Sequence, residues 1–286
     1  MKYIQIAITF TVLCTYAVAE IEEHHAHKGT TKLKLSHENL DFTNSLKKEN
    51  GRRYGLELDY HSNIHHFQFY TDHTNTQTIP KILKNLLVNK YSFKYQYQVN
   101  KDIFSLSYMT INDNLMKEVD GGNIYGLGYK YKSFNITQYI SDYKHFNVYQ
   151  SDIKWNFKKE IDDVMLMGTI VGKYMHLQDR KSNTFTNKVK EDYFTLGVKA
   201  HVHYDGWHLG AGIYVGERIF AVMNEGLKVQ HHAMEFKKSV MLSVGKELGE
   251  NIVVHMRYTK HYATEVPIEH SGVEVDALSL ELSYTF

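Results

Sequence analysis

The sequence predicts an all-β fold: a transmembrane antiparallel up-and-down β-barrel of about 14 strands, with 12 as the alternative count. Three observations predict it. Apolar and polar residues alternate with a period of two almost everywhere after residue 30. The connections between the alternating segments are short and long by turns along the whole chain. Aromatic residues gather beside the short connections.

The start of the chain has the features of a secretory signal. A basic residue, an apolar run and an A-x-A cleavage site at Ala17 to Ala19 follow one another. We therefore expect residues 1–19 to be a cleaved signal peptide, 20–30 a short His-rich segment and 31–286 the barrel. The one cysteine and one of the 33 basic residues lie in the leader, so 32 basic and 32 acidic residues remain. This neutral balance gives no argument for nucleic acid binding.

The composition fits paired strands. There are 22 Tyr, 14 Phe and 18 Gly, but only 2 Pro. Tyrosine and phenylalanine favour strands, whereas proline interrupts a ladder of hydrogen bonds. After the leader, no stretch is apolar for long enough to form a transmembrane helix.

Each predicted strand is a stretch of alternation bounded by turn-forming residues. In chain order the strands are Thr31–Phe42, Gly51–His61, Ile64–Asp72, Asn89–Gln98, Asp102–Ile111, Asn123–Lys132, Phe134–Ser141, His145–Phe157, Val164–His176, Asp192–Tyr204, Trp207–Val222, His232–Leu248, Asn251–Ala263 and Gly272–Phe286.

The connections alternate in length. Every second one is short, as in "SN", "VNK", "DG" and "GE", and the others are mostly longer, as in "NDNLMKEVDGG" and "LQDRKSNTFTNKVKE". A soluble sandwich has no reason to alternate in this way, whereas membrane barrels have short periplasmic turns and longer external loops.

The two faces of the strands differ in chemistry. Ile252, Val254, Met256 and Tyr258 alternate with polar residues, and other strands repeat the pattern. One face is therefore apolar, and the other carries charges that a packed core could not hold. The aromatic residues beside the short turns fit an interfacial girdle: Tyr60, Tyr97, Tyr131, Phe134, Trp155, Phe157, Tyr204, Trp207, Tyr284 and Phe286.

The last strand, "DALSLELSYTF", ends on an aromatic residue. Leu282, Tyr284 and Phe286 share one face. This strand looks like the C-terminal signature of Gram-negative outer-membrane β-barrels, and the strand count is similar to that of the monomeric fourteen-strand porins. The resemblance implies an outer-membrane location in a Gram-negative bacterium, contact with lipid, and recognition of the last strand, which ends at Phe286, by the barrel-assembly machinery. The resemblance does not single out one porin family, so it assigns no functional residues to this sequence.

The polar face predicts the functional residues, because it would line a water-filled lumen. Basic residues outnumber acidic ones on this face, which predicts a weak preference for anions. The alternative is that these charges pair across strands and only hydrate the wall. The predicted lumen-lining residues are Arg53, Glu57, Asp59, Lys90, Lys94, Lys130, Asp152, Lys154, Lys199, His201, His203, Glu235, Lys237, His255, Arg257 and Glu281.

Two further patterns stand out. Ile79, Ile82, Leu83, Leu86 and Leu87 have helical spacing, so we expect a lid or rim helix, with residues 73–88 as the candidate constriction. The histidines at 201, 203 and 208 flank one hairpin, but they come without a cysteine or a fixed carboxylate, and we predict no metal and no cofactor.

The sequence therefore predicts a porin-like channel, a monomer, for passive diffusion of small hydrophilic solutes or ions, with no catalytic step. Two alternatives stay open. One is a non-conducting barrel that acts through its external loops as an interaction protein. The other is an outer-leaflet enzyme, which would need a His–Ser or Asp–His pair converging at the outer rim. His61 and Ser62 are adjacent and would point to opposite faces of a strand.

Overall fold

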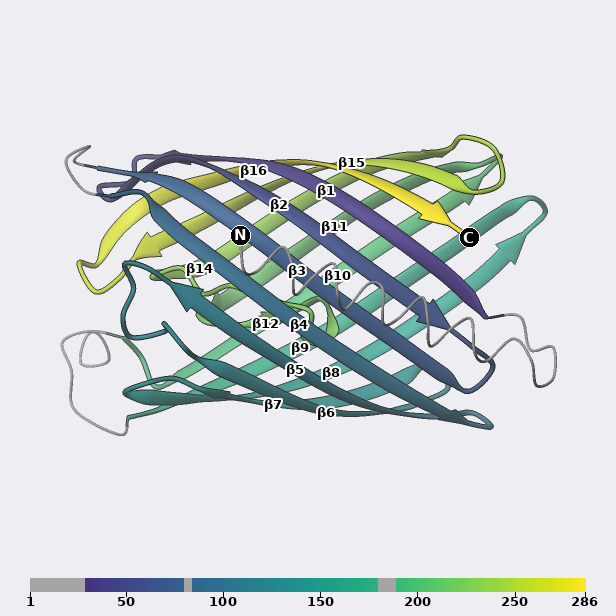
Figure 1. Ribbon diagram of the computed structural model, residues 1–286, viewed down its shortest axis with the longest axis horizontal. Helices are drawn as coiled ribbons and strands as arrows, with labels where there is room; N and C mark the ends of the chain where they lie inside the picture. The colour runs from purple at the N-terminus through teal and green to yellow at the C-terminus, as the bar shows by residue number, and fades with distance from the viewer. Residues whose placement is uncertain (1–28, 80–83, 180–188) are drawn as a thin grey trace.

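The computed structural model describes residues 29–79, 84–179 and 189–286. The expected signal peptide and most of the His-rich segment lie outside these residues. Fourteen strands form one closed antiparallel barrel (Figure 1). They are β1 (Thr30–Thr43), β2 (Lys48–His61), β3 (His65–Thr78), β4 (Leu86–Val99), β5 (Asp102–Asp113), β6 (Asn123–Tyr131), β7 (Phe134–Asp142), β8 (Phe146–Ile161), β9 (Val164–Asp179), β10 (Asp192–Tyr204), β11 (Trp207–Arg218), β14 (Met234–Glu247), β15 (Ile252–Glu265) and β16 (His270–Thr285).

Each strand pairs with its neighbours in the chain, and β16 closes the ring against β1. Leu35 lies opposite Leu282 across this seam, and the backbone N–H of Phe286 donates to the carbonyl of Thr31 at 2.8 Å. Closure leaves none of the fourteen barrel strands at a free sheet edge, which is what a barrel in a lipid bilayer requires. The predicted all-β, up-and-down barrel of fourteen strands is therefore confirmed.

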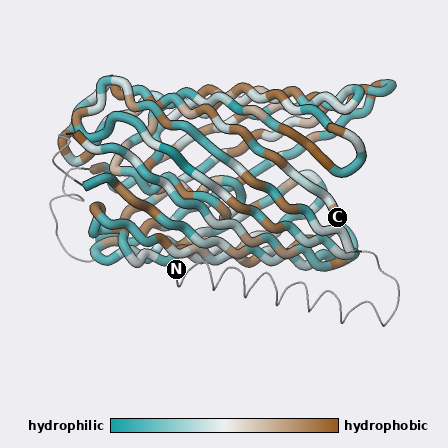
Figure 2. Tube along the Cα trace, turned by 45° about the horizontal axis from the view of Figure 1, so that its top comes forward, coloured by the Kyte–Doolittle hydropathy of each residue, from teal (hydrophilic) through white to brown (hydrophobic). Residues whose placement is uncertain are grey.

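The outer surface carries the predicted apolar stripe. Leu278, Leu280, Leu282, Tyr284 and Phe286 are all exposed, whereas the intervening residues of β16 are half-buried or buried. Figure 2 shows hydrophobic and hydrophilic residues following one another along the strands. Among the described residues, no helix is long and apolar enough to cross a membrane.

The aromatic residues at the short-turn end also face outward. Trp155, Tyr204, Trp207 and Phe286 are exposed, and the rings of Tyr284 and Phe286 meet edge to face with centroids 4.8 Å apart. Amphipathic rings at one level of a barrel are suited to the boundary between headgroups and hydrocarbon.

This surface leads to a prediction about stability. Leu280→Arg places a charge in the middle of the apolar stripe and is expected to lower the free energy of unfolding in lipid vesicles by about 2–4 kcal/mol. Ser279→Arg places the same side chain on the inner face and should cost much less. Denaturant titration of both variants checks this. Equal losses would mean that the stripe does not face hydrocarbon.

Three strand predictions miss the end of the strand by four residues or more. The third strand continues beyond Asp72 to Thr78, β8 continues beyond Phe157 to Ile161, and β11 ends at Arg218 instead of continuing to Val222. The helix expected around residues 79–87 is also contradicted where it is described, because Leu86 and Leu87 begin β4. Residues 80–83 of that stretch lie outside the described residues.

The connection between β11 and β14, residues 219–233, turns into the barrel, and we call it the lumen segment. It contains the short strands β12 (Val222–Met223) and β13 (Lys228–Val229), which pair with each other, and the 3₁₀ turn η2 (Asn224–Gly226). Its first residues, Ile219, Phe220 and Ala221, are completely buried. The largest buried apolar cluster forms where this segment meets residues of β4 to β10.

Candidate functional site

The lumen segment is held to the barrel wall by hydrogen bonds at Val222. Its N–H donates to Oε1 of Gln150 at 2.7 Å, and its carbonyl accepts from Nε2 of Gln150 and from Nζ of Lys173, both at 2.9 Å. Gln150 and Lys173 are buried and belong to β8 and β9. Beside this contact the ring of Phe220 packs on Phe146, with centroids 5.1 Å apart.

Glu225 anchors the tip of the segment. Its carboxylate accepts from Lys94 on β4 at 2.8 Å and from Lys154 on β8 at 2.9 Å. β4 is the seventh strand from β11 in either direction around the ring, so it lies on the opposite wall. Next to Glu225, Ser92 on β4 donates to the carbonyl of Leu227 at 3.0 Å. The lumen segment therefore crosses the barrel from one wall to the other.

The negative charge of Glu225 is stabilised by its two lysine partners. Burial alone would raise its pKa, but the ammonium groups of Lys154 and Lys94 outweigh burial and hold the pKa of the carboxyl well below its usual value. The side chain of Glu225 keeps 47% of its accessibility, whereas those of Lys94 and Lys154 keep 4% and 12%, so the carboxylate is the exposed member of this ion triad.

The turn that presents Glu225 has an unusual backbone. Asn224, Glu225 and Gly226 have φ angles of 48°, 56° and 98°. Left-handed φ values are unfavourable for residues with a Cβ and persist where surrounding contacts hold them. At Gly226 a Cβ would lie 2.5 Å from Oγ of Ser107 on β5, so this close approach to the wall requires glycine.

Several predicted lumen-lining residues form ion pairs between directly opposed positions of neighbouring strands. The pairs are Lys34–Glu57, Glu38–Arg53, Asp72–Lys90 and Asp152–Lys173, and Asp59 accepts from the ring of His66 at 2.8 Å. Lys90 and Asp152 are almost fully buried. Cross-strand pairing therefore accounts for part of the predicted set.

A cavity of about 320 Å³ lies beside the lumen segment, and predicted residues Lys199, Arg257 and Glu281 line it together with Arg53, Glu57 and Lys90. His203 and His255 instead flank His208, with ring centroids 4.0 and 5.1 Å from it.

The remaining predicted residues have various surroundings. Lys130 and His201 are half-buried, and Glu235 is buried. Lys237 is exposed, because the register of β14 shifts between Phe236 and Lys238 and interrupts the alternation there.

Sequence reasoning missed four residues that matter in this arrangement: Lys173, Arg218, Glu225 and Lys228. Lys173 shares the inner face of β9 with Val171 and Met175, so an apolar context hid it. Arg218 follows a bulge between Val215 and Arg218 that resets the alternation. Glu225 and Lys228 lie in the lumen segment, where alternation carries no information about direction.

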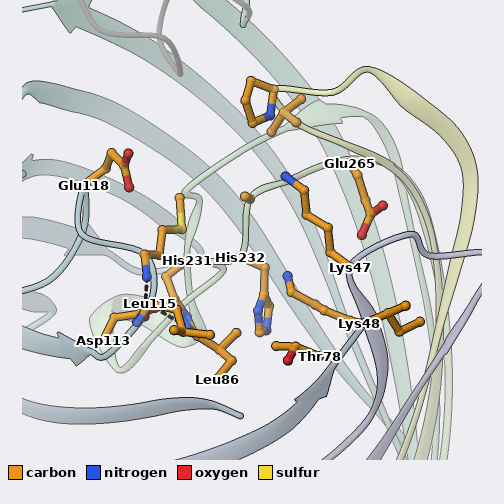
Figure 3. A pocket seen from close by; sticks show the side chains of 15 residues that line it. Lys47, Lys48, Thr78, Leu86, Asp113, Leu115, Glu118, His231, His232 and Glu265 are labelled. Atoms are coloured by element: carbon orange, nitrogen blue, oxygen red, sulfur yellow. Dashed lines mark hydrogen bonds and ion pairs between the residues drawn. The ribbon is translucent and has the colours of Figure 1, made fainter. Parts of the chain in front are cut away.

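A second space lies at the barrel end that carries the long connections (Figure 3). It has a volume of about 520 Å³, and its polar lining includes Lys48, Asp113, His231 and His232. The two histidines lie near the end of the lumen segment, and their rings are tilted by 35° with centroids 4.5 Å apart. Burial lowers the pKa of both rings well below 6.5, and the charge of Lys48 lowers both further. They are therefore neutral at neutral pH.

Within the described part of the chain, no group of three His, Cys, Asp or Glu side chains could hold a metal ion. The histidines at 203 and 208 contact each other, and His208 contacts Glu247 at 2.9 Å.

No family model matches the sequence, and no curated protein matches it significantly. Solved structures do resemble the barrel. Omp33, an outer membrane protein of Acinetobacter baumannii, is 7% identical with a TM-score of 0.51 over 90% of this chain and 99% of its own. A bacterial polysaccharide outer membrane secretin is 6% identical with a TM-score of 0.54, over 92% and 100%. The CymD monoaromatic hydrocarbon channel is 9% identical with a TM-score of 0.52, over 91% and 88%. The chain therefore shares its β-barrel fold with these outer-membrane proteins.

Proposed function

We propose that this chain is an outer-membrane channel through which small hydrophilic solutes or ions diffuse passively, with a weak preference for anions. The observation that carries the proposal is a charged lumen, narrowed by the segment that crosses it, inside a closed barrel with an apolar outer surface. Such a barrel separates water inside from hydrocarbon outside, and its inner charges act on any solute that enters. The sequence-predicted lumen-lining residues would set this selectivity. We assign it no catalytic step.

The setting of the channel is part of the proposal. We infer that the chain is exported with a cleaved signal peptide, is assembled into the outer membrane of a Gram-negative bacterium through its last strand, and works there as a monomer. The exposed aromatic residues at the short-turn end, Phe286 among them, support the placement of the barrel in a membrane.

The charges around the central cavity support the anion preference. Among the described residues, seven basic side chains line it against four acidic ones: Lys34, Arg53, Lys90, Lys199, Arg218, Lys228 and Arg257 against Glu38, Glu57, Asp72 and Glu281. A positive lumen concentrates anions and repels cations.

Planar-bilayer recording of the purified protein tests the channel. We expect discrete current steps and, across a KCl gradient, a reversal potential that shows chloride passing more readily than potassium. Arg257→Glu should shift the reversal potential toward potassium. Arg52→Glu makes the same change at an exposed position and should not.

One observation favours a second candidate function. The lumen segment reaches from wall to wall, as a plug would, and a plugged barrel would act through its external connections as an interaction protein. Absence of current steps at all voltages would favour this function and would exclude the channel.

A further inference from the structure

The central cavity, which is the space of about 320 Å³ beside the lumen segment, holds more positive charge than its acidic residues balance. Three of its acidic residues each form an ion pair with one basic residue on the neighbouring strand. The pairs are Lys34–Glu57, Arg53–Glu38 and Lys90–Asp72. Lys199, Arg218, Lys228 and Arg257 remain against Glu281 alone. Among the described residues, none of these four cations has a carboxylate oxygen within 4.0 Å. Unpaired charge in a partly dehydrated cavity is unfavourable unless a ligand neutralises it.

Arg218 is the most constrained of these cations. It is completely buried, and its guanidinium carbon lies 5.2 Å from the centroid of the Tyr214 ring and 5.5 Å from that of Phe236. Nε donates to Oε1 of Gln230 at 2.8 Å, and Nη2 donates to Oγ of Ser239. Nη1 is buried and has no hydrogen-bond partner among the described residues.

This environment is typical of a prepared binding group. A guanidinium stays protonated at any ordinary pH, and here the two rings and two hydrogen bonds fix its plane. Nη1 is left without a partner, and Arg218 is one of the residues that line the cavity. A buried arginine serving only structure would be expected to have a carboxylate or several carbonyl partners.

The other cations converge on the same space from different elements. Nζ of Lys199, on β10, lies 5.6 Å from the Tyr214 ring, which is also the ring beside Arg218. The lumen segment brings Lys228 together with Gln230, which orients Arg218. The site is therefore complete only while the segment lies inside the barrel.

We propose that the cavity is a binding site for a small oxyanion with two negative charges, such as a dicarboxylate or a phosphate, held chiefly by Arg218. The proposal rests on the proposed function, because the ligand enters through the lumen. Oxygen atoms of a carboxylate or phosphate match the donor edge of a guanidinium, and Lys199, Lys228 and Arg257 supply the remaining charge. The volume of about 320 Å³ limits the ligand to a small molecule.

The test measures block of the KCl current by added anions, together with calorimetric titration of the detergent-solubilised protein. Succinate and inorganic phosphate are the two probes, and acetate is the singly charged control. We expect one or both probes to block saturably, at a concentration at least about tenfold below that of acetate, and to give binding heat. The stronger probe tells whether carboxylate or phosphate is preferred.

Arg218→Gln is expected to weaken the stronger probe about tenfold or more, because a charge-assisted hydrogen bond is lost. The matched control is Arg53→Gln, which removes the same charge from the same cavity at a position paired with Glu38, and it should weaken binding less. If Arg218→Gln fails to fold, Arg218→Lys and the half-buried Lys199→Met serve in its place, and both should weaken block.

The possible failures are distinguishable. A conducting protein that shows neither saturable block nor binding heat with either probe would overturn the site and leave the channel intact. Equal losses in Arg218→Gln and Arg53→Gln would also overturn it, because general electrostatics would then suffice. A protein without current that still binds succinate or phosphate with an Arg218 dependence would support the site and refute the channel.

Discussion

Replacing residues 220–232 with a short glycine–serine connection is expected to raise the single-channel conductance severalfold. The lumen segment crosses from β11 to the opposite wall at β4, so it would lie in the path of ions through the proposed channel. Its removal should leave the wall intact, because β11 and β14 pair directly, with Arg218 opposite Phe236. A short connection can therefore join the two strands as a hairpin. Planar-bilayer recording in KCl gives the measurement.

A second variant separates the segment's bulk from its anchoring. Glu225→Gln leaves the length of the segment unchanged but removes the negative charge that forms ion pairs with Lys94 and Lys154. The two ammonium groups then repel each other, and we expect larger current fluctuations with a mean conductance between wild type and the deletion. An unchanged conductance in the deletion variant would show that the narrowest point lies elsewhere.

The alternation predicted the barrel well because lipid and water impose opposite demands on successive residues of a strand. It failed where that contrast ends. In β3 beyond Asp72 the outward residues His73, Asn75 and Gln77 are polar, so the stretch read as a loop although its backbone continues in the sheet. Here the strand extends past the apolar band, and period two has no lipid-facing signal to follow.

The prediction for the lumen segment was wrong for the opposite reason. Ile219 to Val222 continue an apolar pattern after β11, which read as more strand, yet these residues are buried inside the barrel. Apolar residues facing lipid and apolar residues packed against the inner wall have the same sequence signature. The long-range contacts that decide between them, such as Val222 with Gln150, cannot be read from local spacing.

Some residues of the candidate site could likewise be predicted from the sequence, and others could not. Strand positions such as Arg53 and Lys90 could be assigned to the polar face from alternation alone. Their partners Glu38 and Asp72 required the register of the neighbouring strands. Arg218 could not be found, because a bulge precedes it and its importance lies in the lack of an acidic partner.

The anchoring of the lumen segment should also depend on pH. His231 and His232 are buried at its end, and their ring pKa values lie well below 6.5. Lys47, Lys48, Lys90 and Arg53 surround them, with Asp113, Glu118 and Glu265 as the acidic neighbours. Nearest is Asp113, whose Oδ2 lies 3.9 Å from Nε2 of His231. Burial keeps both rings neutral while the segment is inserted. The inserted state is therefore fully stable only at a pH at which the two histidines would also be neutral in the released segment.

These pKa values determine how the stability of the inserted segment changes with pH. Above pH 6.5 both rings are neutral in either state, so the inserted segment keeps its full stability. As the pH falls below 6.5, released histidines take up protons that inserted ones do not, and each costs the inserted state about 1.4 kcal/mol per pH unit. For two histidines this reaches about 4 kcal/mol at about pH 5. Glu225 does not contribute in this window, because its depressed pKa keeps its ion pairs intact until the pH is well below 4.5.

We therefore expect the conductance of the wild-type channel to rise between pH 7.5 and pH 5.0 toward that of the deletion variant, which itself should change little. The double variant His231→Phe, His232→Phe keeps two rings but cannot take up protons, so its conductance should stay near the neutral-pH value throughout. A wild-type conductance that is the same at both pH values would mean that these histidines remain inserted and uncharged, and that other contacts, such as those of Val222 with Gln150 and Lys173, hold the segment by more than the protonation energy.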